Sequence, residues 1–169
     1  IGGWIISENQ FPRGELPWSN IEDLINQGEH GKLEFKERFS NRKNERISKN
    51  IIKAIAGFSN ANGGELIVGI SDDRKLVGVD PEINEAGGAD KLLLDLGNSI
   101  RSNLGSDFHR FYRVIFQSVE NHTICRIEVF KANKRIFAFK GGDFYKREGN
   151  QTISYSPKDL HELDKSEDW

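Results

Sequence analysis

Residues 44–70 read NERISKNIIKAIAGFSNANGGELIVGI, which is the pattern of a helix, a turn and a buried strand. Ile47, Ile51, Ala54, Ile55 and Phe58 recur at the helical period and predict an amphipathic helix over about 44–60. Glycines 63 and 64 are typical of a helix end, although backbone N–H groups beside glycines can also bind an anion. The apolar run at 66–70 predicts a strand buried on both faces.

Shorter helical and extended patterns surround this stretch. Ser19 and Glu22 have the spacing of a capping box, and Ser156-Pro157 is a typical helix start. Helices are expected over about 19–28, over 89–103 and after Ser156, and strands over 33–36, 76–79, 112–119, 123–130, 136–139 and 144–147, with a turn at 71–75 and a loop at 81–88. Hairpins mixed with helices predict the α/β (α+β) class, with a mixed sheet packed against helices rather than a doubly wound dinucleotide fold.

Composition limits the classes of protein. A chain of 169 residues with 36% hydrophobic and 30% charged residues suits one domain. The net charge of −2 excludes a globally basic protein but not a local basic face, and one cysteine excludes a disulfide framework. No apolar run is long enough to span a membrane and no signal peptide is evident, so we expect no membrane partner and a cytoplasmic location.

The sequence also predicts an organisation of segments. We expect an N-terminal arm at 1–18, a domain at 19–164 and a tail at 165–169, with Trp4, Phe11 and Trp18 docking on the domain or on a partner. The chain begins at Ile1 and contains no methionine. We therefore expect a fragment of a longer protein that has further domains.

One candidate site is a basic stripe on the predicted helix. Arg42, Arg46, Lys49 and Lys53 are spaced four, three and four residues apart, opposite the apolar face. Four cations along a helix can follow a phosphate backbone. The alternative interpretation is an ordinary solvated helix face.

A second candidate site is a group of carboxylates. Glu34 and Lys36 point to the same side of a predicted strand, Glu29 lies just upstream, and Asp72 or Asp73 follows the buried strand. Carboxylates bind Mg²⁺ or Mn²⁺, and a nearby lysine would stabilise a cleaved phosphate. The alternative is an exposed Glu–Lys pair and an aspartate in a turn.

A third candidate lies near the C-terminus. Tyr145 could stack on a base, while Lys146, Arg147, Asn150 and Thr152 could contact phosphates. The alternative is an edge strand followed by a polar turn. The sequence has no P-loop and no Gly-x-Gly-x-x-Gly motif, and its histidines lack the spacing of metal ligands.

Four motifs carry a resemblance to a known family. Residues 28–36 read GEHGKLEFK, 54–64 read AIAGFSNANGG, 66–73 read LIVGISDD, and 144–152 read FYKREGNQT with Ser156-Pro157 after them. In this order they resemble the Schlafen-type AlbA domain family over about residues 20–164. The resemblance implies an Alba-like nucleic-acid-binding domain, often found within larger regulators, and the missing P-loop argues against the ATPase label once given to the family.

In the Schlafen branch, the resemblance implies an RNA endonuclease whose acidic triad would be Glu29, Glu34 and Asp72, binding Mg²⁺ or Mn²⁺. That reading needs a second lobe, from a homodimer or from the rest of a longer chain. The family's arginine after the closing threonine is Ile153 here. Gly57 replaces a helical alanine, at an expected cost of about 1 kcal/mol.

The sequence thus supports three hypotheses. The first is a module that binds DNA or RNA through phosphates, as part of a transcriptional regulator or a defence protein. The second is a metal-dependent endoribonuclease with Glu29, Glu34, Lys36 and Asp72 as catalytic residues. The third is a protein-interaction or dimerisation domain that uses the aromatic N-terminal arm.

Overall fold

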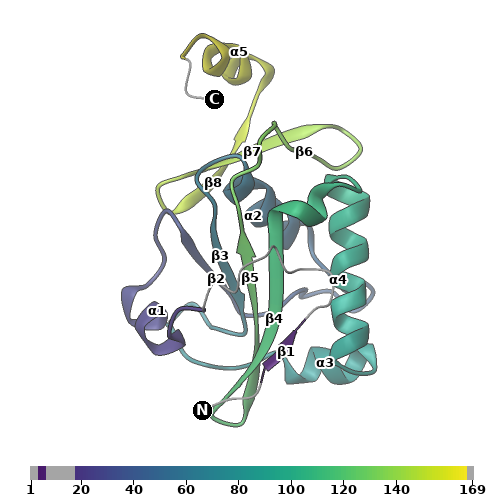
Figure 1. Cartoon of the computed structure of the whole chain (residues 1–169). Coiled ribbons are helices and arrows are strands. Elements are labelled where there is room, and N and C mark those ends of the chain that lie inside the picture. The colour runs from purple at the N-terminus through teal and green to yellow at the C-terminus, as the bar shows by residue number, and fades with distance from the viewer. Residues whose placement is uncertain (1–3, 7–17, 167–169) are drawn as a thin grey trace.

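The computed structural model describes residues 4–6 and 18–166. Its main sheet has five strands in the order β1-β4-β5-β3-β2 (Figure 1). β2 runs parallel to β3, while the other neighbours are antiparallel. The strands are β1 (Trp4–Ile6), β2 (Leu33–Lys36), β3 (Gly64–Val68), β4 (Tyr112–Val119) and β5 (His122–Val129). This mixed sheet with helices packed on it confirms the predicted fold class.

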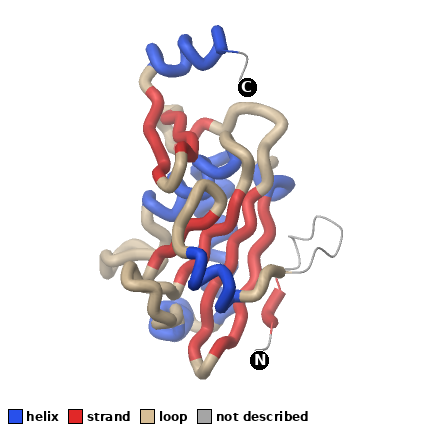
Figure 2. The backbone as a smooth tube through the Cα atoms, turned by 90° about the vertical axis from the view of Figure 1, so that its left-hand side faces the viewer, coloured by secondary structure: helices blue, strands red, loops and turns tan. Residues whose placement is uncertain are grey.

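The described helices are α1 (Ile21–Gln27), α2 (Lys49–Ser59), α3 (Asp80–Ala86), α4 (Ala89–Leu104) and α5 (Pro157–Ser166), with a 3₁₀ turn at Phe108–Phe111. All but α5 lie on the faces of the main sheet. The larger core joins α2 and α4 to one face of the sheet, and the smaller core joins α1 to the other face. Figure 2 shows α1 in front of the sheet and α5 apart from it.

A second, antiparallel sheet contains β6 (Phe137–Ala138), β7 (Asp143–Glu148) and β8 (Gln151–Tyr155). Asn60, at the end of α2, ties this sheet to the helix. Its buried amide donates to the Ile136 and Tyr145 carbonyls and accepts from the Ile136 N–H, each at 2.8 Å. This second sheet therefore has a fixed position against α2.

The long elements match the prediction and the short ones differ. The helix at 89–104 and the hairpin of β4 and β5 are confirmed. Residues 76–79 form only an isolated bridge between Leu76 and Ile70, and the expected loop at 81–88 contains most of α3. Asn20 rather than Ser19 caps α1, and β8 was not predicted.

The start of α2 is the correction that matters most for function. Ser48 is its N-cap, so residues 41–48 form a loop rather than the first turns of a helix. Ile47 continues the apolar period because it packs against the main core from outside the helix. Arg42 and Arg46 therefore do not share a helix face with Lys49 and Lys53.

Two parts of the predicted N-terminal arm lie on the domain. β1 pairs with β4 at the edge of the main sheet. The Trp18 ring lies 4.0 Å from the Arg113 guanidinium carbon and 5.3 Å from that of Arg126. Phe11 and the tail at 167–169 fall outside the described residues, and the boundaries of the arm and the tail stay predictions.

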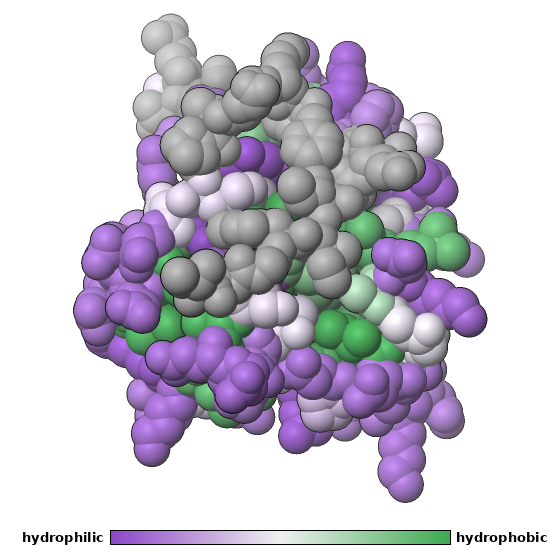
Figure 3. All heavy atoms as spheres, turned by 60° about the horizontal axis from the view of Figure 1, so that its bottom comes forward, coloured by the Kyte–Doolittle hydropathy of each residue, from purple (hydrophilic) through white to green (hydrophobic). Residues whose placement is uncertain are grey.

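The described surface in Figure 3 is mainly hydrophilic, with apolar patches between hydrophilic side chains. None of the described helices is long and apolar enough to cross a membrane.

Candidate nucleic-acid interface

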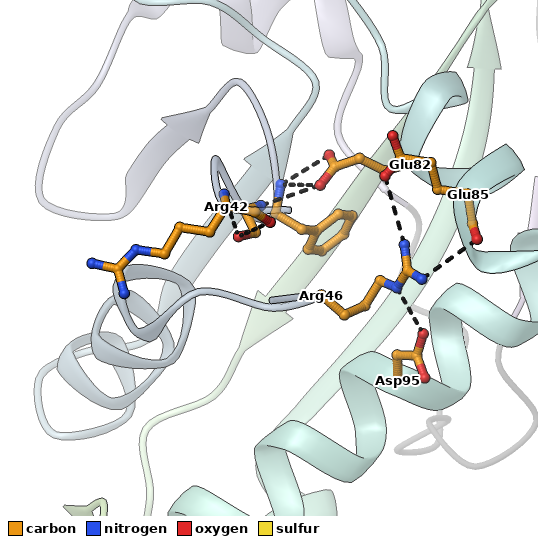
Figure 4. Close-up of polar contacts among 7 residues, drawn as sticks. Arg42, Arg46, Glu82, Glu85 and Asp95 are labelled. Atoms are coloured by element: carbon orange, nitrogen blue, oxygen red, sulfur yellow. Dashed lines mark hydrogen bonds and ion pairs between the residues drawn. The ribbon is translucent and has the colours of Figure 1, made fainter. Parts of the chain in front are cut away.

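The loop before α2 takes its shape from a carboxylate of α3. Glu82 accepts the backbone N–H of Phe39 at 3.0 and 3.1 Å and that of Ser40 at 3.1 Å (Figure 4). The Phe39 ring is fully buried in the main core. Burial raises the pKa of Glu82, with the two N–H donors opposing the shift. These contacts hold the loop and the side chains that follow it.

Arg46 is bound to the fold. Its guanidinium lies 3.2 Å from the Asp95 carboxylate on α4 and 3.8 Å from the Glu85 carboxylate on α3, and it donates to the Glu85 carbonyl at 3.4 Å (Figure 4). This corrects the predicted stripe of four phosphate-binding cations. Arg46 neutralises two carboxylates and joins the loop to α3 and α4.

Arg42, Lys49 and Lys53 face outward. The Arg42 side chain is exposed and extends away from the other labelled residues in Figure 4. Lys49 Nζ lies 5.3 Å from the Phe139 ring centroid, and Lys53 Nζ lies 5.6 Å from that of Tyr145. The two rings meet edge to face at 6.2 Å. The rings attract both ammonium groups and so position them one helical turn apart.

These three cations line a hollow of about 380 Å³ at the start of α2, here called the basic hollow. It is completed by Asn41, Glu45, Ser48 and Asn50. In the part of the chain that the structure describes, none of the three cations has an ion-pair partner. The Ser48 side chain makes no capping hydrogen bond, which leaves its hydroxyl available at this helix start.

A neighbouring hollow of about 470 Å³ has a different charge. Its lining includes four carboxylates, Glu37, Glu45, Glu82 and Glu85, and four cations, Arg38, Arg42, Lys43 and Arg46. The charges of its lining therefore cancel. The basic hollow, with three cations and one carboxylate, is the better site for an anion.

The motif at residues 144–152 does not form one surface. Arg147 points inward, with 2% of its side chain exposed, and pairs with the Glu34 carboxylate. Its guanidinium also donates to the His30 carbonyl at 2.8 Å and to the Leu33 carbonyl at 3.1 Å. These contacts hold the Arg147 guanidinium inside the fold, and its expected contact with a phosphate stays a prediction.

The neighbours of Arg147 point in several directions. Tyr145 is 8% exposed and lies beneath Lys53, so it offers no open face to a base. Lys146 stands opposite Ile153 on the other face of β7 and β8, and Asn150 is exposed in their turn. Strand alternation separates residues that the sequence pattern grouped together.

Thr152 packs against α2 and explains Gly57. A Cβ atom on Gly57 would lie 2.9 Å from Thr152 Cγ2 and 3.1 Å from its Oγ1. Such contacts are too close, so glycine is needed where β8 crosses the helix. Thr152 therefore packs against α2. The glycine at position 57 lowers the helix propensity, but it also allows β8 to approach the helix closely.

The predicted acidic residues have structural partners. Glu34 lies between Arg147 and Lys36, whose Nζ is 3.2 Å away. Glu29 accepts the Phe35 N–H at 3.0 Å. Because β2 is an edge strand, Glu29 binds a backbone N–H that no neighbouring strand pairs.

Asp72 is exposed in the turn after β3. Within residues 4–6 and 18–166, no group of three or more histidine, cysteine, aspartate or glutamate side chains could hold a metal ion. The described structure therefore does not bring Glu29, Glu34 and Asp72 together as one metal-binding group, and their catalytic role stays a prediction.

Sequence reasoning missed two residues that shape the interface. Glu82 fixes the loop that carries Arg42, and its sequence position in a short, proline-containing helix gave no signal. Asn60 stood in a quoted motif, but its place at a helix end suggested only a cap. A buried asparagine that bonds β7 and the residue before β6 is visible only in three dimensions.

Comparisons with known proteins agree with this fold. The crystal structure of the DIP2311 protein from Corynebacterium diphtheriae is similar, with a TM-score of 0.57 and 18% sequence identity over 86% of this chain. The chain spans 27% of that protein. No curated protein matches the sequence at a significant level. The family described as Schlafen, AlbA_2 matches residues 29–156, and the chain therefore belongs to the Schlafen AlbA_2 family.

Proposed function

We propose that this chain is a nucleic-acid-binding module that contacts phosphates at the basic hollow. The observation that carries the proposal is the convergence of Arg42, Lys49 and Lys53 on one hollow without ion-pair partners among the described residues. Membership of the AlbA_2 family supports a nucleic acid as the anion.

The contacts explain what kind of binding to expect. Lys49 and Lys53 are held over aromatic rings, while Tyr145 is buried and cannot stack on a base. Recognition therefore rests on phosphate charge, which is the same for every sequence. With three phosphate contacts we expect dissociation constants in the micromolar range or weaker at physiological salt.

Such a surface accepts either DNA or RNA. Each cation can bind a phosphate oxygen, and no residue of the basic hollow is committed to a base edge. A longer protein or a second copy would add contacts and raise the affinity through effective concentration. The basic hollow is then one contact point of a larger interface.

The test compares binding of labelled duplex DNA and single-stranded RNA to the wild-type chain and to two triple variants. The variant Arg42→Ala/Lys49→Ala/Lys53→Ala removes the cations of the basic hollow. The control Lys91→Ala/Lys131→Ala/Lys158→Ala removes three exposed cations elsewhere, so it changes the net charge equally. We expect at least tenfold weaker binding in the first variant and less than threefold weakening in the control.

Two results would contradict the proposal. Equal weakening in both variants would mean that net charge, not the basic hollow, governs binding. Cleavage that needs Mn²⁺ and is lost in Asp72→Ala, at an exposed position, would favour the endoribonuclease hypothesis when read on a denaturing gel.

A further inference from the structure

The shape and charge of the basic hollow point to one part of a nucleic acid. Building on the proposed function, we propose that the basic hollow binds a terminal phosphate monoester of a nucleic-acid strand in preference to an internal phosphodiester. The proposal rests on the arrangement of Arg42, Lys49, Lys53 and Glu45 around one concave site.

The charge of the lining matches a monoester. Three cations and one carboxylate give the basic hollow a net charge of +2. Oε1 of that carboxylate, Glu45, accepts the Ser40 hydroxyl at 2.9 Å. A monoester carries about −1.5 to −2 charges near pH 7, against −1 for a diester.

The donors also approach from different sides. Arg42 and Asn41 come from the loop, Ser48 and Asn50 from the start of α2, and Lys53 from its next turn. A terminal monoester has three free oxygens to meet such donors, whereas an internal diester has two. An internal diester would also have to place the sugars on both of its sides at the edge of the basic hollow.

The two lysines are positioned rather than free. Their ammonium groups lie over the Phe139 and Tyr145 rings, which meet each other edge to face. Less side-chain freedom is therefore lost when an anion binds. A volume of about 380 Å³ accepts a phosphate with part of its terminal nucleotide.

The experiment measures the affinity of the full 169-residue chain for internally labelled oligonucleotides of one sequence, in EDTA, by fluorescence anisotropy. The strands carry a 5′-phosphate, a 3′-phosphate or hydroxyl groups at both ends. We expect one phosphorylated end to bind about tenfold more tightly than the hydroxyl strand. Inorganic phosphate should reduce binding of that strand more than binding of the hydroxyl strand.

Variants assign the preference to the basic hollow. Arg42→Ala should abolish the preference, because it removes one of the three cations of the basic hollow. The Arg42 side chain is exposed, so the variant should keep the fold. Lys43→Ala is the matched control, since Lys43 is exposed next to Arg42 but does not line the basic hollow. Circular dichroism verifies that both variants fold.

The outcomes separate this inference from the proposed function. Equal affinity for all three strands, lost in Arg42→Ala, would overturn the inference and keep the phosphate-binding module. A preference that survives Arg42→Ala would also overturn it, because the monoester would then bind elsewhere. No binding of any strand would overturn both proposals.

Discussion

Arg147 on β7 and Glu34 on β2 form a shielded ion pair that joins the second sheet to the edge of the main sheet. Their side chains are 2% and 13% exposed. The same guanidinium binds two carbonyls beside the edge strand and lies 4.9 Å from the Phe58 ring centroid. In the sequence, Arg147 resembles a phosphate contact and Glu34 resembles a catalytic carboxylate. In the structure, the pair stabilises the junction between the two sheets.

Replacement of Glu34 should destabilise the fold. Glu34→Ala leaves the buried Arg147 charge without its carboxylate, and breaking a buried pair costs about 3–5 kcal/mol. We expect a loss near the lower limit, because Arg147 keeps its two carbonyl partners. Urea unfolding of Glu34→Ala measures this loss.

Lys36→Ala is the control for Glu34→Ala. Lys36 is more exposed than Arg147 and pairs with the same carboxylate, so its loss should cost less than about 1 kcal/mol. Wild-type stability in Glu34→Ala would contradict the structural role.

Gly57→Ala should also destabilise the protein. The new Cβ would meet Thr152 Cγ2 at 2.9 Å, and overpacking of this kind costs about 1–3 kcal/mol. Gly97→Ala is the matched control, because Gly97 lies within α4 with nothing within 4 Å of a new Cβ. That control should stabilise the chain by up to about 1 kcal/mol. Thermal unfolding of Gly57→Ala, Gly97→Ala and the Gly57→Ala/Thr152→Ala double variant tests whether removal of Thr152 atoms relieves the clash.

Asn60→Asp should loosen the second sheet. The change keeps the size but removes both donors to the Ile136 and Tyr145 carbonyls. Because these groups are buried, we expect a loss of about 2–4 kcal/mol. Hydrogen exchange should show the first loss of protection in β6 and β7, and equal exchange in all strands would argue against a local role. Asn62→Asp, at an exposed position nearby, is the control.

Glu82 should make stability depend on pH. Burial raises the pKa of its carboxyl above the ordinary 4.5 in the folded state. The folded protein therefore holds this proton more tightly than the unfolded chain. The resulting stabilisation is complete below pH 4.5 and is lost as pH rises through the folded pKa.

Glu82→Gln removes this titration and can still accept the loop N–H groups. The difference in unfolding free energy, wild type minus Glu82→Gln, should fall as pH increases above about 4.5. Urea unfolding of both proteins across that range measures it. A difference that stays constant or rises would contradict the assigned direction.

Periodic patterns predicted the long elements because burial of one face determines them. The helix containing Leu92, Leu96 and Ile100 and the hairpin of β4 and β5 are examples. The predicted helix began too early, at about residue 44, whereas α2 begins at Lys49. The reason is that Ile47, which lies in the loop, fits the apolar period of the helix. The short helix at 80–86 has no fully buried side chain and only two partly buried apolar ones, Ile83 and Ala86, so no apolar period marked it.

The site was harder to predict than the fold. The spacing of charges in the sequence indicated three cations that line one hollow, Arg42, Lys49 and Lys53. It could not show that the fourth, Arg46, binds carboxylates of α3 and α4. Likewise, a strand sequence does not show which face packs on a helix, so Arg147 resembled a phosphate contact. Pairing partners distant in sequence decided both cases.

The salt dependence of binding tests the central claim most directly. Affinity for duplex DNA and for single-stranded RNA is measured over a range of salt concentrations with the wild-type chain and the Arg42→Ala/Lys49→Ala/Lys53→Ala variant. Three phosphate contacts predict a slope of log K against log salt of about −2.7 for duplex DNA and about −2.1 for single strands. The variant should approach zero slope, whereas a flat wild-type response, or an unchanged slope in the variant, would contradict phosphate binding at the basic hollow.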